Sequence, residues 1–384
     1  MRTNLISLIL VAVASTASAQ SAPTVTLARS DARFAEPFSS LAGIRELAGG
    51  RLVVSDRLEQ SVSVIDFRTG TMTPVGRQGQ GPGEYTMPGP LFAFPGDSTM
   101  LLDLGNMRGI IVTPDGKLGK TVDLLSPEGL PLIPRAADGR GRLYAQPVLM
   151  LRGSTTTSGP DSTPLLRLTL ATKMIDTVAW LANSGIAGGG GAFSSRSGGS
   201  GGGGPRNISL RARPYSPDDG WAVTPDGRIA VVRATGYHVE WLAPGGRRTP
   251  GPALRYEPVK IGKAEKEQWA DQRAKGSVMI MRTPQGSQTM RAPKPNIDEQ
   301  DWPEAKPPFE AQGVLATPEG EVWIRVSQPA SAKAAVFDVV DAAGRLVKHV
   351  KLPDGRRLVG FGRGTLYAVQ TDADDLEWLE RYSR

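Results

Sequence analysis

The chain has 384 residues, including 46 glycines, 31 prolines and no cysteine, and its formal net charge is +7. The absence of cysteine excludes disulfides, thiolate metal sites, a cysteine nucleophile and the cysteine-linked lipid of bacterial lipoproteins. A basic chain could bind nucleic acid, but here the lysines and arginines are spread along the sequence and no nucleic-acid motif occurs. We therefore expect no nucleic-acid partner.

The first residues, MRTNLISLILVAVASTASAQ, have the pattern of a secretory signal peptide. A basic start is followed by an apolar run and by Ala17-Ser18-Ala19, an A-x-A cleavage site. The apolar run is shorter than the roughly 20 residues that a membrane-spanning helix needs. We assign residues 1–19 to a signal peptide and residues 20–384 to the mature protein. The mature protein is expected to be periplasmic or extracellular, without lipid and without a membrane span.

Short alternating strands separated by tight turns begin at residue 42 and predict an all-β fold. The first unit reads AGIREL, RLVVSD, SVSVIDF and TMTPVG, with glycine-containing turns after the first and third strands. Four short antiparallel strands of this kind form one blade of a β-propeller. The pattern recurs over residues 89–124, 132–181, 220–254, 311–352 and 356–382.

The last unit has only three strands, and residues 24–29 (TVTLAR) form a spare one. We therefore predict a monomeric six-bladed β-propeller that an N-terminal strand closes by completing the sixth blade, so that no sheet edge is left open. Two insertions interrupt the repeat. Residues 182–205 are a Gly/Ser segment that is expected to be flexible, and residues 260–308 contain a helix candidate over 263–275.

Tryptophans divide into two groups. Trp180, Trp241, Trp323 and Trp378 fall on predicted strands and are expected to pack between blades. Trp302 stands next to a proline-rich run and is a candidate ligand contact, for example a platform for a sugar ring. The alternative is that Trp302 pins the second insertion to its blade.

The segment GRQGQGPGEY, residues 76–85, holds four glycines and a proline between two apolar runs. It lacks the helix that follows a dinucleotide-binding fingerprint, and no Lys-Ser or Lys-Thr pair follows its glycines. We interpret it as a turn-rich connection across one face of the propeller. Such loops carry function on rigid scaffolds, so Arg77, Gln78, Gln80, Glu84 and Tyr85 are candidate ligand contacts. Alternatively, Glu84 and Tyr85 anchor the loop.

The order IRELAGGRLVVSD, SVSVIDFRTG and VGRQGQGPGEY resembles exported bacterial six-bladed β-propellers, in which a glycine-rich element ending in G-P-G-E-[FY] follows the first blade. The stretch LLDLGNMRGIIV is similar to an NHL repeat, with Asp103, Asn106 and Arg108 in the D-x-x-N-x-R positions. The first unit keeps only Asp56 of that pattern. The resemblance extends over residues 24–384 and implies a fold rather than an activity.

We expect a non-enzymatic binding module, with no catalytic residue and no cofactor, for a peptide, glycan, small molecule or envelope protein. Only two histidines occur, so a three-histidine zinc site is impossible, and no G-x-S-x-G element occurs. The alternative is a calcium- or zinc-dependent hydrolase, lactonase or lyase with oxygen ligands at the central channel, as in related six-bladed lactonases. Asp56, Asp103 and Asn106 are its candidate ligands. Against this, Asp56 and Asp103 are expected to bridge blades by hydrogen bonds.

Overall fold

The protein is described by a computed structural model over most of its length. The described residues are 22–125, 129, 132–147, 162–182, 214–276, 278–283, 286–291 and 293–384, with backbone only for 275–276, 278–283 and 286–291. The expected signal peptide, residues 1–19, and nearly all of the Gly/Ser insertion lie outside the described residues.

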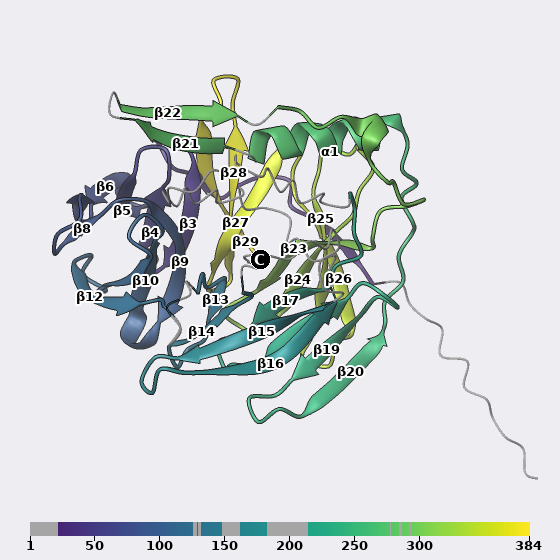
Figure 1. Cartoon of the computed structure of the whole chain (residues 1–384), viewed down its shortest axis with the longest axis horizontal. Coiled ribbons are helices and arrows are strands. Elements are labelled where there is room, and N and C mark those ends of the chain that lie inside the picture. The colour runs from purple at the N-terminus through teal and green to yellow at the C-terminus, as the bar shows by residue number, and fades with distance from the viewer. Residues whose placement is uncertain are drawn as a thin grey trace, which may run out of the picture.

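Six sheets are arranged as blades around a central axis, which confirms the predicted six-bladed β-propeller. In Figure 1 the colour of the chain changes from blue through teal and green to yellow around the ring, so blades that are consecutive in sequence are neighbours in space. Each blade is an antiparallel meander whose first strand lies nearest the axis.

The first three blades have four strands each. Blade 1 comprises β3 (Leu41–Glu46), β4 (Leu52–Asp56), β5 (Ser61–Asp66) and β6 (Thr71–Pro74). Blade 2 comprises β9 (Pro88–Phe94), β10 (Ser98–Asp103), β11 (Arg108–Val112) and β12 (Leu118–Asp123). Blade 3 comprises β13 (Ala136–Ala137), β14 (Arg142–Ala145), β15 (Ser162–Thr169) and β16 (Met174–Ala182).

The last three blades complete the ring. Blade 4 comprises β17 (Gly220–Val223), β18 (Ile229–Arg233), β19 (His238–Leu242) and β20 (Arg248–Ala253). Blade 5 comprises β23 (Phe309–Ala316), β24 (Val322–Val326), β25 (Val336–Val340), β26 (Leu346–Lys351) and the parallel strand β1 (Thr24–Thr26). Blade 6 comprises β27 (Arg356–Gly362), β28 (Thr365–Thr371), β29 (Glu377–Ser383) and β2 (Ala32–Arg33).

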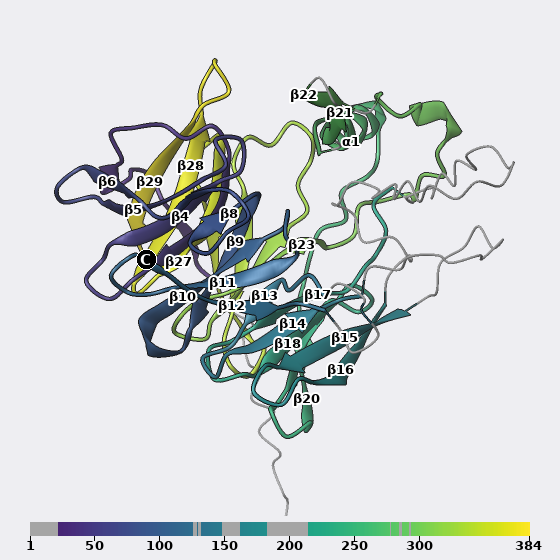
Figure 2. The same cartoon turned by 60° about the vertical axis from the view of Figure 1, so that its left-hand side comes forward.

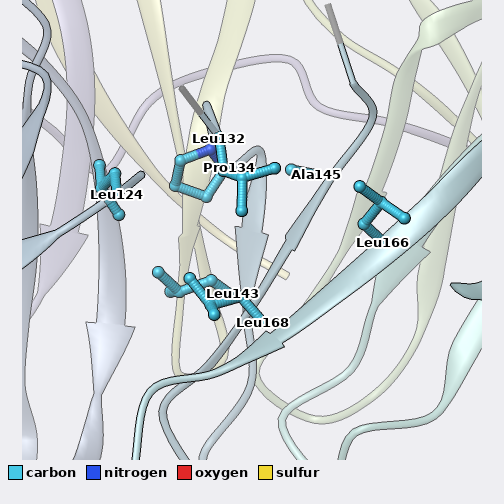
Figure 3. Close-up of a pocket in the computed structure, with 7 residues that line it drawn as sticks. All are labelled: Leu124, Leu132, Pro134, Leu143, Ala145, Leu166 and Leu168. Atoms are coloured by element: carbon cyan, nitrogen blue, oxygen red, sulfur yellow. The ribbon is translucent and has the colours of Figure 1, made fainter. Parts of the chain in front are cut away.

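The hydrophobic core is divided into six clusters, and each cluster fills the seam between two neighbouring blades. The seam between blades 6 and 1 contains Phe34, Leu52, Ile65, Tyr367 and Leu379. Every blade therefore buries both of its faces against neighbours, and this burial is the main favourable contribution to folding. An apolar void of about 10 Å³ lies in the seam between blades 2 and 3 and is lined mostly by leucines (Figure 3). It is about the size of one water molecule at most.

The closing strand differs from the prediction in position. Residues 24–29 were expected to complete blade 6, but β1 lies parallel to β26 at the outer edge of blade 5. It is β2, a few residues further on, that pairs antiparallel with β29 and completes blade 6. The reason is burial: Phe34 and Phe38 directly follow β2 and enter the seam between blades 6 and 1, whereas all three residues of β1 are exposed.

Of the four strand tryptophans, two are buried between blades as predicted, one is exposed and one is half-buried. Trp241 and Trp323 are buried between blades. Trp180 is 55% exposed, because the alternation along β16 turns Ala179 and Leu181 inward and Trp180 outward. Trp378 is half-buried, and the guanidinium of Arg33 lies 4.1 Å from its ring centre.

The two faces of the propeller differ in the length of their connections. Because neighbouring strands alternate in direction, the turns between strands 1 and 2 and between strands 3 and 4 of a blade, where the chain is continuous, lie on one face, here called the lower face, and they span two to five residues. The connections between blades, and those between strands 2 and 3 of a blade, lie on the opposite, upper face. The long stretches 146–161, 183–219 and 254–308 all start and end there.

The second insertion contains the predicted helix, α1 (Lys263–Gly276), followed by the hairpin β21 (Val278–Thr283) and β22 (Gly286–Arg291). Both elements stand apart from the blades on one side of the ring (Figure 2). In the described part of the chain, no helix is long and apolar enough to cross a membrane.

If burial after β2 closes the ring, substitution of Phe34 should be costly and substitution in β1 should not. Phe34 is 1% exposed and Val25 is 42% exposed. We expect Phe34→Ala to lower the free energy of unfolding by about 3–5 kcal/mol, and Val25→Ala to change it by less than about 0.5 kcal/mol. Urea denaturation of both variants measures this. Equal losses would contradict the assignment of β2 as the closing strand.

Candidate functional site

The NHL-like residues of blade 2 hold the glycine-rich connection in place. Asp103, whose side chain is 0% exposed, ends β10 and accepts hydrogen bonds from the amides of Thr86 and Met87, both at 3.1 Å. Asn106 and Arg108 donate to its second oxygen at 2.7 and 3.3 Å. Arg108 also donates to the carbonyl of Glu84. The D-x-x-N-x-R pattern thus fixes the connection between blades 1 and 2.

Asp56 does the same at the end of β4. One carboxylate oxygen accepts from the amides of Ser39 and Ser40 at 2.7 and 3.0 Å, and the other accepts from those of Leu58 and Glu59 at 2.9 and 3.0 Å. The residue joins the turn of its own blade to the segment that arrives from blade 6. This favours the bridging interpretation of both aspartates.

In their observed positions, Asp56, Asp103 and Asn106 are not arranged to bind a metal ion in the channel. The oxygens of Asp56 face four amides, and those of Asp103 face two amides, Asn106 and a guanidinium, so a cation would have to displace all of these donors. Among the described residues, no group of three or more His, Cys, Asp or Glu side chains could hold a metal ion. The calcium or zinc interpretation therefore rests on the sequence alone.

The glycine-rich segment is a tied loop rather than a phosphate cradle. Its ends form a short parallel pair, β7 (Arg77–Gln78) with β8 (Glu84–Tyr85). The Glu84 carboxylate accepts from the Gly81 amide and from Arg77, each at 2.8 Å, and these bonds hold the pKa of Glu84 below its usual range. A Cβ at Gly79 would lie 2.1 Å from that carboxylate, so only glycine fits there.

The candidate contacts on this loop divide into anchors and exposed groups. Tyr85 is buried and its hydroxyl accepts from the Val62 amide at 2.9 Å, which supports the anchoring interpretation. Arg77, Gln78 and Gln80 are exposed on the upper face, where Gln78 donates to Gln60. These three side chains stay predicted ligand contacts.

Trp302 lies within the second insertion and fixes it internally. Its indole N–H donates to the carbonyl of Ile297 at 2.8 Å, and its ring packs edge-on against Trp269 with centroids 5.4 Å apart and lies 6.1 Å from Tyr215. These contacts of the half-buried ring lie within the insertion or go to the connection that precedes β17, not to a blade strand, so both interpretations of Trp302 stay predictions. Nearby, the buried ammonium of Lys306 donates to the side chain of Gln268 and to the carbonyl of Gln328.

A large bulge in β23 brings polar side chains to the upper opening of the channel. Phe309 pairs with Val326 and Val314 pairs with Ile324, so residues 310–313 stand opposite the single residue Arg325. A Cβ at Gly313 would lie 2.5 Å from that of Arg325, so glycine permits the bulge. Glu310, at its start, forms an ion pair with Arg325 at 3.3 Å.

Arg135 lies at the upper end of blade 3. It directly precedes β13, and β13, β17 and β23 are inner strands that lie side by side near the axis in both views (Figures 1 and 2). The guanidinium lies 5.1 Å from the ring centre of Trp221 on β17 and donates to Gln146 at 3.3 Å, and the Trp221 indole donates to the same oxygen. Within the described residues Arg135 has no carboxylate partner.

Both charged groups are water-accessible yet surrounded by protein. Glu310 is 47% exposed and Arg135 is also exposed. Nevertheless, desolvation raises the pKa of Glu310, against the opposing influence of Arg325 and Lys306, and desolvation lowers the pKa of Arg135 to about 10. Arg135, Gln146, Trp221, Glu310 and Arg325 lie at or near the upper ends of strands of blades 3, 4 and 5, and we call them the mouth residues.

Sequence reasoning missed the mouth residues. Gly313 in a strand pattern was the one local signal, since an isolated strand glycine often marks a bulge. Nothing in the sequence near Arg135 or Gln146 indicates that they meet a tryptophan of the next blade.

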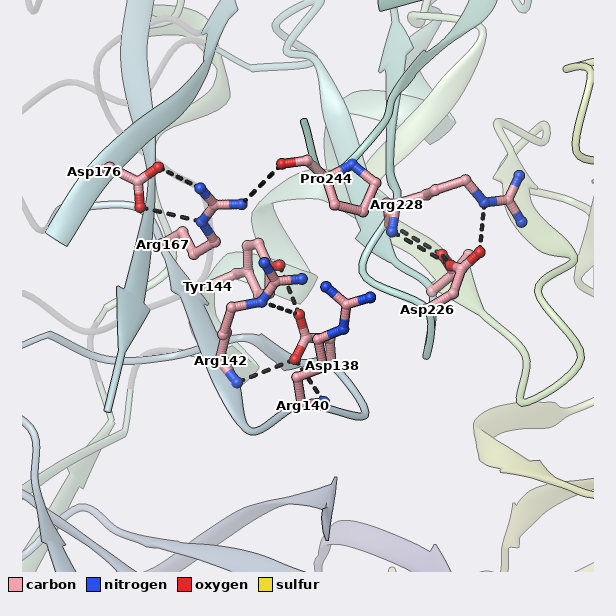
Figure 4. A network of polar contacts seen from close by, with 10 residues as sticks. Asp138, Arg140, Arg142, Tyr144, Arg167, Asp176, Asp226, Arg228 and Pro244 are labelled. Atoms are coloured by element: carbon pink, nitrogen blue, oxygen red, sulfur yellow. Dashed lines mark hydrogen bonds and ion pairs between the residues drawn. The ribbon is translucent and has the colours of Figure 1, made fainter. Parts of the chain in front are cut away.

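The lower face carries a different, structural network (Figure 4). Buried Asp138, in the turn between β13 and β14, accepts from the Arg142 side chain at 2.6 Å and from the Tyr144 hydroxyl at 2.9 Å. The amide of Gly139 donates to the carbonyl of Pro225 in the next blade. These bonds hold the turn of blade 3 and tie it to blade 4, although the Nη2 atom of Arg142 is buried without a hydrogen-bond partner.

No family model and no curated protein matches this chain. Solved structures resemble it over most of its length. A member of the DUF4221 family from Bacteroides vulgatus is 10% identical, with coverage of 93% of this chain and 98% of that one and a TM-score of 0.46. A gluconolactonase from Xanthomonas campestris is 12% identical, with coverage of 91% of both chains and a TM-score of 0.43. Regucalcin, a calcium-binding protein from Agrobacterium tumefaciens, is 10% identical, with coverage of 94% and 97% and a TM-score of 0.38. Such scores transfer no activity to this chain.

The bonds around Asp103 predict a specific loss of stability in acid. Burial alone would raise the pKa of Asp103, but the bonds from Met87, Asn106 and Thr86 hold it below its usual value. A lowered carboxyl pKa contributes stability above the unfolded pKa of about 3.9, and that contribution is lost as the pH falls through the folded pKa. Asp103→Asn should therefore be clearly less stable than wild type near neutral pH. The difference should shrink below about pH 4.

Urea denaturation of wild type and Asp103→Asn across this pH range tests the prediction. A difference in unfolding free energy that stays constant from neutral to acidic pH would show that the Asp103 carboxylate does not supply the stability.

Proposed function

We propose that this protein is a non-enzymatic binding protein that accepts a carboxylate or phosphate group of its ligand at the channel mouth. The observation that carries the proposal is Arg135. This guanidinium is desolvated and water-accessible, and no carboxylate among the described residues neutralises it. Arginine presents a planar set of donors that suits carboxylates and phosphates.

The charges around the opening support an anionic group. Arg135, Arg325 and Lys306 are cationic; Glu310 interacts with Arg325 and Lys306, and Glu265 also interacts with Lys306. Desolvation raises the pKa of Glu310, so this carboxylate takes up a proton at a higher pH than an exposed glutamate does. Trp221 holds the arginine in a fixed place, so less side-chain freedom is lost on binding.

A ligand larger than its anionic group would extend over the upper face. The exposed side chains of Arg77, Gln78 and Gln80 lie on that face, at the connection between blades 1 and 2. We propose them as secondary contacts for a peptide, glycan or protein partner. The export expected from residues 1–19 would place this binding in the periplasm or outside the cell.

Substitution of Arg135 should weaken anion binding without affecting the fold. We expect at least one of glucuronate, gluconate and inorganic phosphate to bind the wild type at millimolar concentration and constant ionic strength. Arg135→Gln should weaken that binding about tenfold or more, since a charge-assisted hydrogen bond contributes roughly 1.5–3 kcal/mol. Arg135→Lys should retain part of it. Isothermal titration calorimetry measures the affinities.

Arg140→Gln is the matched control, because it removes an exposed arginine from the lower face. Binding that falls equally in Arg135→Gln and Arg140→Gln would reflect net charge alone. That result, or no binding of any of the three anions to the wild type, would count against the proposal.

Glu310 predicts how anion binding depends on pH. Its raised pKa means that it gains a proton at a higher pH than an ordinary glutamate, whose pKa is about 4.3. As the pH falls through that raised pKa, the repulsion between Glu310 and the anion disappears, so affinity should rise. Glu310→Gln should bind more tightly than wild type at neutral pH and should lose this rise. A pH series of titrations with both proteins measures it, and identical profiles would exclude Glu310 from the site.

A further inference from the structure

A second recess lies on the upper part of blade 1, away from the channel mouth. It has a volume of about 270 Å³ and is enclosed by the face of blade 1 that points toward blade 6, by the segment that joins β2 to β3, and by Leu376 in a turn of blade 6. Ligand pockets commonly start near 300 Å³, so this recess suits a small molecule. We propose that it binds a small primary amine in its protonated form.

The Ser63 hydroxyl lines this recess without a protein partner. Ser63 on β5 is 7% exposed as a residue, but its hydroxyl makes no hydrogen bond within the described part of the chain and is reached by solvent. A ligand in the recess could therefore take the place of water at this hydroxyl. Ser61, two residues earlier on β5, lines the same wall. Its hydroxyl also makes no hydrogen bond to a described residue.

The charged groups of the recess are all acidic. Glu36, Asp56 and Glu59 line it, and no lysine, arginine or histidine does, although the chain as a whole carries a net charge of +7. Asp56 is occupied by four amides. Glu59 uses one oxygen to accept from the Ser39 hydroxyl. Its other oxygen and the whole carboxylate of Glu36 have no partner among the described residues, so they can accept from an ammonium.

Two basic side chains near the recess are engaged elsewhere. Arg33 stacks on the ring of Trp378 at 4.1 Å, and Arg357 forms an ion pair with Glu377. Arg57 adjoins Asp56 but does not line the recess, and neither Glu36 nor Glu59 forms an ion pair among the described residues, so a cation from solution would supply a counterion. An ammonium with three N–H donors fits carboxylates and a serine hydroxyl better than a quaternary ammonium, which has none.

The rest of the wall is apolar and limits the body of the ligand. Phe38, Val54, Met72 and Leu376 contribute side chains to the recess. These apolar side chains could pack against a short hydrocarbon chain attached to the ammonium group. The site is separate from the mouth residues, because it is built from blade 1 and the closing segment and contains none of them.

The probe for this site is n-butylammonium. Titrations at constant ionic strength should show that it binds the wild type, that tetramethylammonium binds more weakly, and that the neutral butan-1-ol does not bind measurably. Glu59→Gln and Glu36→Gln should each weaken butylammonium binding, and the double variant should weaken it by about tenfold or more, because charge-assisted hydrogen bonds are lost. Ser63→Val should also weaken it by filling the wall with methyl groups.

The control is Glu257→Gln, which removes an exposed carboxylate that does not line the recess. It should leave the affinity unchanged. If Ser63→Val fails to fold, the two surface glutamate variants still decide the question. Equal binding of butan-1-ol, an affinity that the double variant retains, or the same loss in Glu257→Gln would each overturn the proposal.

Discussion

Closure of the ring between blades 6 and 1 is the interaction on which the rest of the structure depends. A propeller blade has two apolar faces, and only a complete ring covers both faces of all six. The chain has no cysteine, so closure relies on non-covalent contacts. Glu46 on β3 accepts from the Arg363 amide and from the hydroxyls of Thr365 and Tyr367, which joins the first blade to the last.

The N-terminal segment reinforces this seam. After β2 pairs with β29, Phe34 and Phe38 enter the core between the two blades, and the next residues lead directly into β3. The same segment carries Glu36 and forms one wall of the amine recess. The closing strand and the proposed recess are thus parts of one structure, so loss of closure would also remove the recess.

The two faces of the ring differ in their connections: the upper face carries the long ones, and the lower face carries only short turns. The lower turns span two to five residues, and short-range bonds such as those of Asp138 to Arg142 and Tyr144 hold them. On the upper face, the Asp56 and Asp103 carboxylates organise the connections, and the bulge of β23 places Glu310 beside Arg325. The resulting charges are local: the mouth is cationic and the recess is acidic, which a net charge of the whole chain cannot reveal.

The sequence by itself determined the strands, their order in six blades, the helix of the second insertion and the structural nature of the glycine-rich loop. These features depend on alternation, turn residues and spacing among near neighbours in the chain. The partner of the N-terminal strand, the outward face of Trp180 and the meeting of Arg135 with Trp221 were decided only by the tertiary structure. Each of these depends on which residues, distant in sequence, compete to be buried in the same seam, and local pattern carries no record of that competition.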